Sequence, residues 1–340
     1  MMIRITASLM AFAAAVTVTA YAAEEYQIQF PKGVDGSVLV IPDDNPMTAA
    51  KVELGKQLYF DKRLSADGTV SCATCHDPAK GWTDQLPVSN GVGGKHGTRS
   101  APTVLNSAFN YMQFWDGRAP SLEEQAKGPI ENPVEMADKL DRVVGWLNSV
   151  PGYRTQFAAV FGGPATADRV AQAIAAFERT VYSGNSAYDR YTQDKDENAL
   201  TPAAKRGLAL FEGKAQCTQC HVGFDLSDRV FHNIGVGMNA KDPDLGRYVV
   251  TKQDKDKGAF KTPILRDLLK TAPYMHDGSV KTLEDVIELY DVGGEPNPWL
   301  DPKMKPLNLT DAEKADLLAF LKSLEGDTPI ITAPPLPKAP

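Results

Sequence analysis

The sequence has few cysteines and few histidines, and it carries no excess of positive charge. Its 340 residues include only four Cys and five His, and the formal net charge is −7. This net negative charge argues against a nucleic-acid-binding protein, because the phosphates of nucleic acids attract Lys and Arg. Beyond the N-terminus no apolar run is long enough to cross a bilayer, so we do not expect an integral membrane protein.

The first 22 residues have the pattern of an export signal. A basic start, "MMIR", precedes an Ala-rich apolar stretch, and Ala20-Tyr21-Ala22 forms a small-x-small cleavage site. The apolar stretch is shorter than a membrane span. We therefore predict a signal peptide over residues 1–22 and a mature protein in the periplasm.

All four cysteines lie in two short motifs, "CATCH" and "CTQCH". An even number of cysteines in an exported protein also fits disulfides, and paired cysteines also fit zinc. The pairs are too far apart for a zinc ribbon, and neither lies in a βαβ pattern typical of a thioredoxin site. C-x-x-C-H is the attachment signature of c-type haem, in which two thiols bind the porphyrin and the histidine binds its iron. The sequence predicts two covalently bound haem c groups, held by Cys72, Cys75, His76, Cys217, Cys220 and His221.

The two motifs lie in similar halves. A short helix is predicted before each motif, and another helix is predicted about a hundred residues later, over 166–181 and 310–324. The matching positions of the two first helices are Gly55, Leu58 and Tyr59, and Gly207, Leu210 and Phe211. We expect a mainly α, loop-rich protein with two cytochrome c-like domains, over residues 23–186 and 187–327, and a Pro-rich tail over 328–340.

The unassigned iron ligands decide the function, since an iron with an empty face reacts with peroxide and a closed iron only transfers electrons. Three histidines lie outside the motifs. His96 is in a Gly-rich loop and is either solvated or a ligand to the first haem. We interpret His232 as a structural or propionate-side group. His276 stands in "PYMHDG", before a predicted helix that ends near Tyr290.

The region between the haem motifs contains Trp115, Gln125 and Glu135 in a stretch without helical or strand periodicity. These residues fit a loop with surface carboxylates. They also fit a peroxide site, because a carboxylate beside an open iron can move a proton between the two peroxide oxygens. The chemistry of the residues leaves both interpretations open.

The motifs "RSAPTVLN", "QFWDGRA", "LEEQAKGP", "NPVEM" and "PYMHDG" stand in the order of the bacterial dihaem cytochrome c peroxidase family, which includes the MauG-like enzymes. The chain resembles this family from about residue 48 to residue 324. The resemblance implies that the haem on His76 reacts with peroxide, with Glu135 as acid and base, Gln125 as its companion and Trp115 between the haems. It also implies an inter-haem calcium ion at Thr271 and Pro273, where Ser100 replaces the Asn of the family.

Two departures from the family pattern bear on mechanism. Family members that need reductive activation have a distal histidine at the position of Val92, whereas His96 is displaced by four residues. We therefore expect the first haem to be open. Tyr290 occupies the place where the cytochrome-oxidising members have a Met ligand, and the MauG-like branch has an axial Tyr there. We predict Tyr290 as the ligand of the second iron, with Met275 as the alternative.

The resemblance implies a peroxidase that reduces hydrogen peroxide at the first haem. The second haem then shares or relays oxidising equivalents. The partner is an electron-donor protein, either a small c-type cytochrome or a cupredoxin, or else a protein whose side chains are oxidised as in MauG. A non-catalytic dihaem electron carrier is the alternative from a different class, and it requires His96 to close the first iron.

Overall fold

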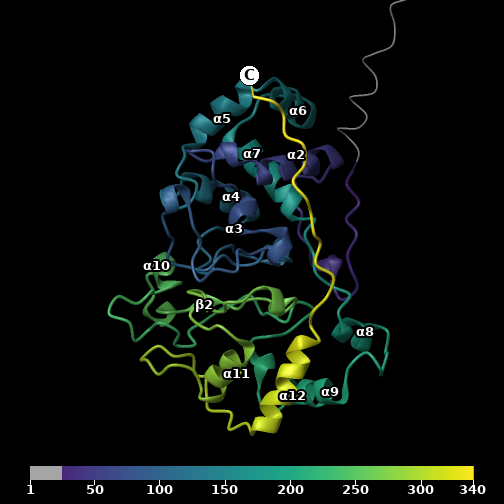
Figure 1. The fold of residues 1–340 in the computed structure, drawn as a ribbon, viewed down its shortest axis with the longest axis vertical. Helices are drawn as coiled ribbons and strands as arrows, with labels where there is room; N and C mark the ends of the chain where they lie inside the picture. Colours follow the sequence, from purple (N-terminus) through teal and green to yellow (C-terminus); the bar gives the residue numbers. More distant parts are fainter. Residues whose placement is uncertain (1–24, 340) are drawn as a thin grey trace, which may run out of the picture.

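The computed structural model describes residues 25–339. It is helical and rich in loops, and the sheet in this part of the chain has two short strands. Figure 1 shows two helical bodies, one above the other, with the strands between them. The predicted fold class is confirmed, whereas the predicted signal peptide lies outside the described residues. None of the described helices is both long and apolar enough to span a membrane.

The helices and strands are short relative to the loops that join them. The α-helices are α2 (Ala49–Phe60), α3 (Cys72–Cys75), α4 (Leu122–Glu131), α5 (Leu140–Ser149), α6 (Pro151–Phe161), α7 (Ala167–Glu178), α8 (Ala187–Gln193), α9 (Pro202–Glu212), α10 (Tyr248–Thr251), α11 (Leu283–Asp291) and α12 (Asp311–Lys322). The strands are β1 (Phe231–His232) and β2 (Phe260–Lys261), paired antiparallel.

The upper body contains α2 to α7 and is built around the crossing of α2 and α7 (Figure 1). A Cβ atom on Gly55 would lie 1.8 Å from the Ala173 carbonyl oxygen, so only glycine permits this approach of the two backbones. Next to the crossing, the rings of Tyr59 and Phe177 lie 5.1 Å apart, edge to face. Both aromatic residues are fully buried.

The lower body repeats this arrangement with α9 and α12. A Cβ atom on Gly207 would lie 1.9 Å from the Asp316 carbonyl oxygen, and the rings of Phe211 and Phe320 are 5.0 Å apart. Helix α9 begins with Thr201 as N-cap and proline at its first position. The sequence match between the halves therefore reflects one packing motif used twice.

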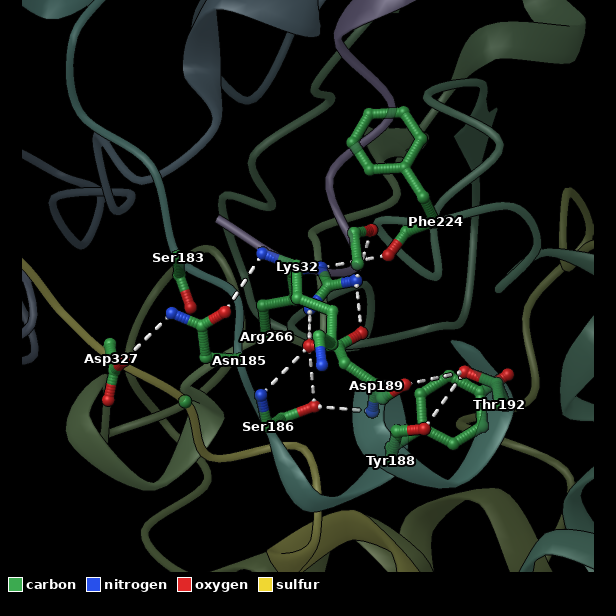
Figure 2. A network of polar contacts seen from close by, with 12 residues as sticks. Lys32, Ser183, Asn185, Ser186, Tyr188, Asp189, Thr192, Phe224, Arg266 and Asp327 are labelled. Carbon is green, nitrogen blue, oxygen red and sulfur yellow. Dashed lines mark hydrogen bonds and ion pairs between the residues drawn. The ribbon is translucent and has the colours of Figure 1, made fainter. Parts of the chain in front are cut away.

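A buried polar network joins the lower body to the N-terminal segment (Figure 2). Its centre is Arg266, which donates two hydrogen bonds to Asp189 on α8, at 2.7 and 2.9 Å. The same guanidinium donates to the Gly33 carbonyl at 2.7 Å and to the Phe224 carbonyl at 2.8 Å. Because both charges are buried, removal of either partner would leave an unpaired charge in the interior.

The C-terminal tail runs in extended form from α12 along the upper body, the yellow trace of Figure 1. The Trp82 indole donates a hydrogen bond to the Pro329 carbonyl at 3.0 Å, and Arg63 donates to the Pro337 carbonyl at 2.9 Å. Ile331 packs against the core of the upper body. The tail thus connects the end of the chain to its first half.

Candidate functional site

Both C-x-x-C-H motifs form single helical turns, α3 and a 3₁₀ turn over Cys217–Gln219. All four cysteines are free and half-buried, which removes the disulfide interpretation for this structure. The first motif contributes Cys75 and His76 to the wall of one cavity, and the second contributes Cys217, Cys220 and His221 to the wall of another. The two cavities share part of their lining, which includes Ser100, Phe114 and Trp115.

The motif histidines are placed to act as iron ligands. The Leu226 carbonyl lies 2.8 Å from Nδ1 of His221, which places the proton on Nδ1 and leaves Nε2 free toward the cavity. Nδ1 of His76 is buried and has no hydrogen-bond partner. Burial lowers the pKa of both imidazoles, which favours the neutral form that binds metal. Paired thiols, a neutral imidazole and a cavity at each motif fit haem c.

The first cavity contains the predicted peroxide-site residues. His76, Gln125 and Glu135 all line it. His96 is exposed on its loop, where its backbone pairs with Asn90, and it is not among the residues that line this cavity. The structure therefore places the carboxyl and the amide, but not the loop histidine, beside the motif histidine.

Glu135 is half-buried, and Asn132 holds its carboxylate. The Asn132 amide donates a hydrogen bond to Oε1 of Glu135 at 2.6 Å. Burial raises the pKa of the Glu135 carboxyl, and the Asn132 hydrogen bond and the charge of Arg118 oppose this effect. A carboxyl that is oriented by one hydrogen bond and partly desolvated is suited to accept and return a proton.

The second cavity contains both candidates for the other axial ligand. Tyr290 reaches it from α11, and Met275 reaches it from the loop before that helix. Burial raises the pKa of the Tyr290 hydroxyl well above its usual value. The charges of Cys217 and Cys220 raise it further. The motif histidine of this cavity, His221, lines the same space.

The remaining histidines of the second cavity have different environments. His276 is buried and stacks on the Phe260 ring, with ring centres 3.6 Å apart. Both ring nitrogens of His232 contact carboxylates, Asp301 at 2.6 Å and Asp228 at 2.9 Å. Cys220, Asp228 and His232 have ligand atoms within 4.8 Å of one another. Since Cys220 belongs to the haem motif, we assign no further metal to this group.

Trp115 lines both cavities. Its indole nitrogen donates a hydrogen bond to the Ser100 carbonyl at 2.9 Å, and the Ser100 amide donates to the His276 carbonyl at 2.7 Å. The indole is therefore held by the Ser100 carbonyl, and the Ser100 backbone is in turn bonded to His276 of the second half. Ser100, Thr271 and Pro273, the predicted calcium positions, all line the second cavity.

Some residues of the site did not follow from the sequence. Arg99 lies at the junction and donates to Asp116 at 2.7 Å and to Asp244 at 2.6 and 2.9 Å. Glu178 and Ser107 also line the first cavity. Glu178 could have been noticed in the sequence, because it follows a run of apolar residues that predicts a buried helix. A glutamate is rarely buried without a specific reason.

Comparison with known proteins gives one consistent result. A family model described as di-haem cytochrome c peroxidase matches residues 49–197. The methylamine utilization protein MauG of Methylorubrum extorquens is 46% identical over 298 residues, 87% of this chain and 84% of that protein. The cytochrome c551 peroxidase of Pseudomonas aeruginosa is 39% identical over 303 residues, 86% and 83% of the two chains. The crystal structure of a MauG-like protein associated with microbial copper homeostasis has a TM-score of 0.83 at 35% identity, covering 91% of this chain and 99% of that one.

Proposed function

This chain belongs to the di-haem cytochrome c peroxidase family and carries two haem c groups, and from this premise we propose that peroxide reacts at the haem held by His76. The observation that carries the proposal is the composition of the first cavity. It holds one histidine together with Gln125 and Glu135, while His96 is exposed outside it. When bound, the haem supplies the iron that coordinates peroxide and exchanges electrons with it.

The protein residues of the first cavity handle the protons. Glu135 takes the proton from the near oxygen of peroxide and returns it to the leaving oxygen. The Asn132 hydrogen bond holds one carboxylate oxygen and leaves the other available for this exchange. Gln125, on the same wall, orients the bound oxygen through its amide.

Trp115 couples the two centres, because its ring lines both cavities and is held in place by the Ser100 carbonyl. Tyr290 and His221, which line the same cavity, would hold the second iron. An anionic phenolate favours the ferric and higher states, whereas the thioether of Met275 would favour the ferrous state. The second centre is therefore suited to share an oxidising equivalent, and His276 supports it from the wall of the same cavity.

The ligand assignment is tested by ferric-state electron paramagnetic resonance and absorption spectra of the holoenzyme. Tyr290→Phe is expected to change the signal of the second iron and to leave haem content unchanged. The matched variant Met275→Leu should leave both spectra as they are. The opposite pattern would assign Met275 as the ligand.

The same spectra separate the peroxidase from a dihaem electron carrier. An open first iron predicts a high-spin component that responds to peroxide and persists in His96→Ala. If every ferric signal is low-spin and peroxide has no effect, the chain is an electron carrier and the proposal fails.

The reductant is the second part of the proposal. A small c-type cytochrome or a cupredoxin in the periplasm would make the chain a cytochrome c peroxidase, and the predicted signal peptide supports this compartment. The phenolate at Tyr290 supports the alternative, in which side chains of a partner protein are oxidised as in the MauG-like branch. Steady-state turnover with reduced cytochrome, compared with oxidation of a co-purifying protein, distinguishes the two.

A calcium ion between the haems is the last element of the proposal. Hard oxygen ligands at Thr271 and Pro273 support it, and Ser100 offers a short hydroxyl where the family has an amide oxygen. The Ser100 hydroxyl lies 3.4 Å from the Leu86 carbonyl, a long contact that leaves it available. Metal analysis of the holoenzyme before and after chelator treatment tests this assignment.

A further inference from the structure

The wall of the first cavity formed by α4 and α7 carries a second carboxyl that the mechanism above does not use. Glu178 is the last residue of α7, is 5% exposed, and lines the cavity with Gln125 and Glu135. Its Oε2 atom is buried without a hydrogen-bond partner. Burial of a carboxylate with an unpartnered oxygen costs free energy. The protonated or hydrogen-bonded form of this group is therefore favoured.

The charge of Arg179 lowers the pKa of the Glu178 carboxyl but does not offset the effect of burial. Arg179, the next residue, is paired with Glu123 of α4 at 2.7 Å. Glu123 itself adds negative charge on this side. From the other elements packed here, Tyr59 and Cys72 lie close enough for the charge of Glu178 to raise their pKa values, and Cys72 becomes an uncharged thioether on haem attachment. Burial first of all raises the pKa of Glu178 to about 8, so its carboxyl is protonated at neutral pH.

A second unsatisfied group lines the same cavity. The Ser107 side chain, 8% exposed as a residue, has a buried hydroxyl without a hydrogen-bond partner. No hydrogen bond joins this hydroxyl to Glu178, and a water molecule can bridge two buried polar groups that face one cavity. A carboxylic acid can donate to such a water, and a serine hydroxyl can donate or accept.

We propose that Glu178 and Ser107 hold a buried water in the first cavity, and that Glu178 stores there a proton consumed in peroxide reduction. The inference rests on the proposed peroxide site at His76. Reduction of peroxide breaks the O–O bond and forms two waters, with two electrons from the donor protein and two protons from the medium. Glu135 moves a proton already on peroxide, whereas Glu178 supplies a new one through the bridging water and regains it from solvent.

Infrared spectra of the ferric holoenzyme test the stored proton independently of activity. At pH 7 we expect a carbonyl stretch of a protonated carboxylic acid that shifts in D₂O. The band should disappear in Glu178→Gln and persist in Glu135→Gln. A wild-type protein without the band, or a band that survives Glu178→Gln, would overturn the proposal.

The rate of peroxide reduction provides the second test of the proposal. In Glu178→Gln we expect peroxide reduction at pH 7 to slow by about tenfold or more. In wild type the rate should fall as pH rises through about 8, because the reservoir is then deprotonated. This dependence should be absent from Glu178→Gln, and a wild-type dependence that survives in the variant would contradict the role.

If Glu178→Gln does not give a folded holoenzyme, Ser107→Ala is the alternative variant. It keeps the carboxyl and removes one partner of the water, so the band should remain and change frequency, and an unmoved band would exclude the shared water. Failure of this inference is distinct from failure of the peroxide site. An unchanged rate in Glu135→Gln would remove the proposed mechanism, whereas the infrared band concerns Glu178 alone.

Discussion

Two carboxyls line the first cavity, and their surroundings give them different chemistry. Glu135 is held by the Asn132 amide and lies near the charge of Arg118, both of which favour its anionic form against burial. Glu178 has an unpartnered oxygen and is more deeply buried. Environments that separate the pKa values of two acids are how one site obtains both a base and an acid. We assign the exchangeable proton to Glu135 and the stored proton to Glu178.

A substitution at Glu135 tests the first of these roles. Glu135→Gln keeps the size of the side chain and removes its ability to take up a proton. We expect intact haem content and a reaction with peroxide that is slower by about 100-fold or more. Stopped-flow absorption after mixing with peroxide measures this rate, and Glu131→Gln, at an exposed position on α4, is the control. An unchanged rate would remove Glu135 from the mechanism.

At the scale of elements, the two halves share a helix crossing that depends on one glycine each. Gly55 and Gly207 lie where a partner helix presents a backbone carbonyl less than 2 Å from any added Cβ. The neighbouring aromatic pairs then fill the crossing with nearly equal ring separations, 5.1 and 5.0 Å. Since each crossing stands beside a haem motif, its geometry sets the position of the motif turn.

Gly207→Ala is expected to lower the stability of the holoenzyme by about 2 kcal/mol or more, since the methyl group must push a backbone carbonyl away. The measurement is the midpoint of thermal unfolding, followed by the absorption of the haem. Gly145→Ala, on α5 with open space around the added Cβ, is the matched control. The control should be neutral or slightly stabilising, because alanine favours helix. Equal midpoints for the two variants would contradict the role of the crossing.

At the scale of the whole molecule, both ends of the described chain tie the two bodies together. The N-terminal segment offers the Gly33 carbonyl to Arg266, and the tail receives the Trp82 hydrogen bond at Pro329. Two further contacts cross the junction: Arg99 donates to Asp244, and the Lys261 amide donates to the Trp115 carbonyl at 2.8 Å. Electron sharing between two haems needs a fixed separation, and these contacts supply it.

Ile331→Ala tests the contribution of the tail. Ile331 packs against the core of the upper body, whereas its neighbour Ile330 is 74% exposed. We expect Ile331→Ala to lower the unfolding free energy by about 1 kcal/mol or more, and Ile330→Ala to change it by less than about 0.5 kcal/mol. Denaturant titration of both variants measures the difference. Equal midpoints would show that the tail does not stabilise the upper body.

The sequence alone determined the chemistry of attachment and the repeated framework. Cysteine spacing specifies the haem bonds locally, and helix caps and apolar periodicity act within a few residues, so both can be read without coordinates. Tertiary structure decided which separated groups meet. It placed Trp115 at both cavities, left His96 in solvent, and brought Glu178 and Ser107 to the lining of the first cavity. Burial and the absence of a partner depend on contacts between distant segments, and no local pattern encodes them.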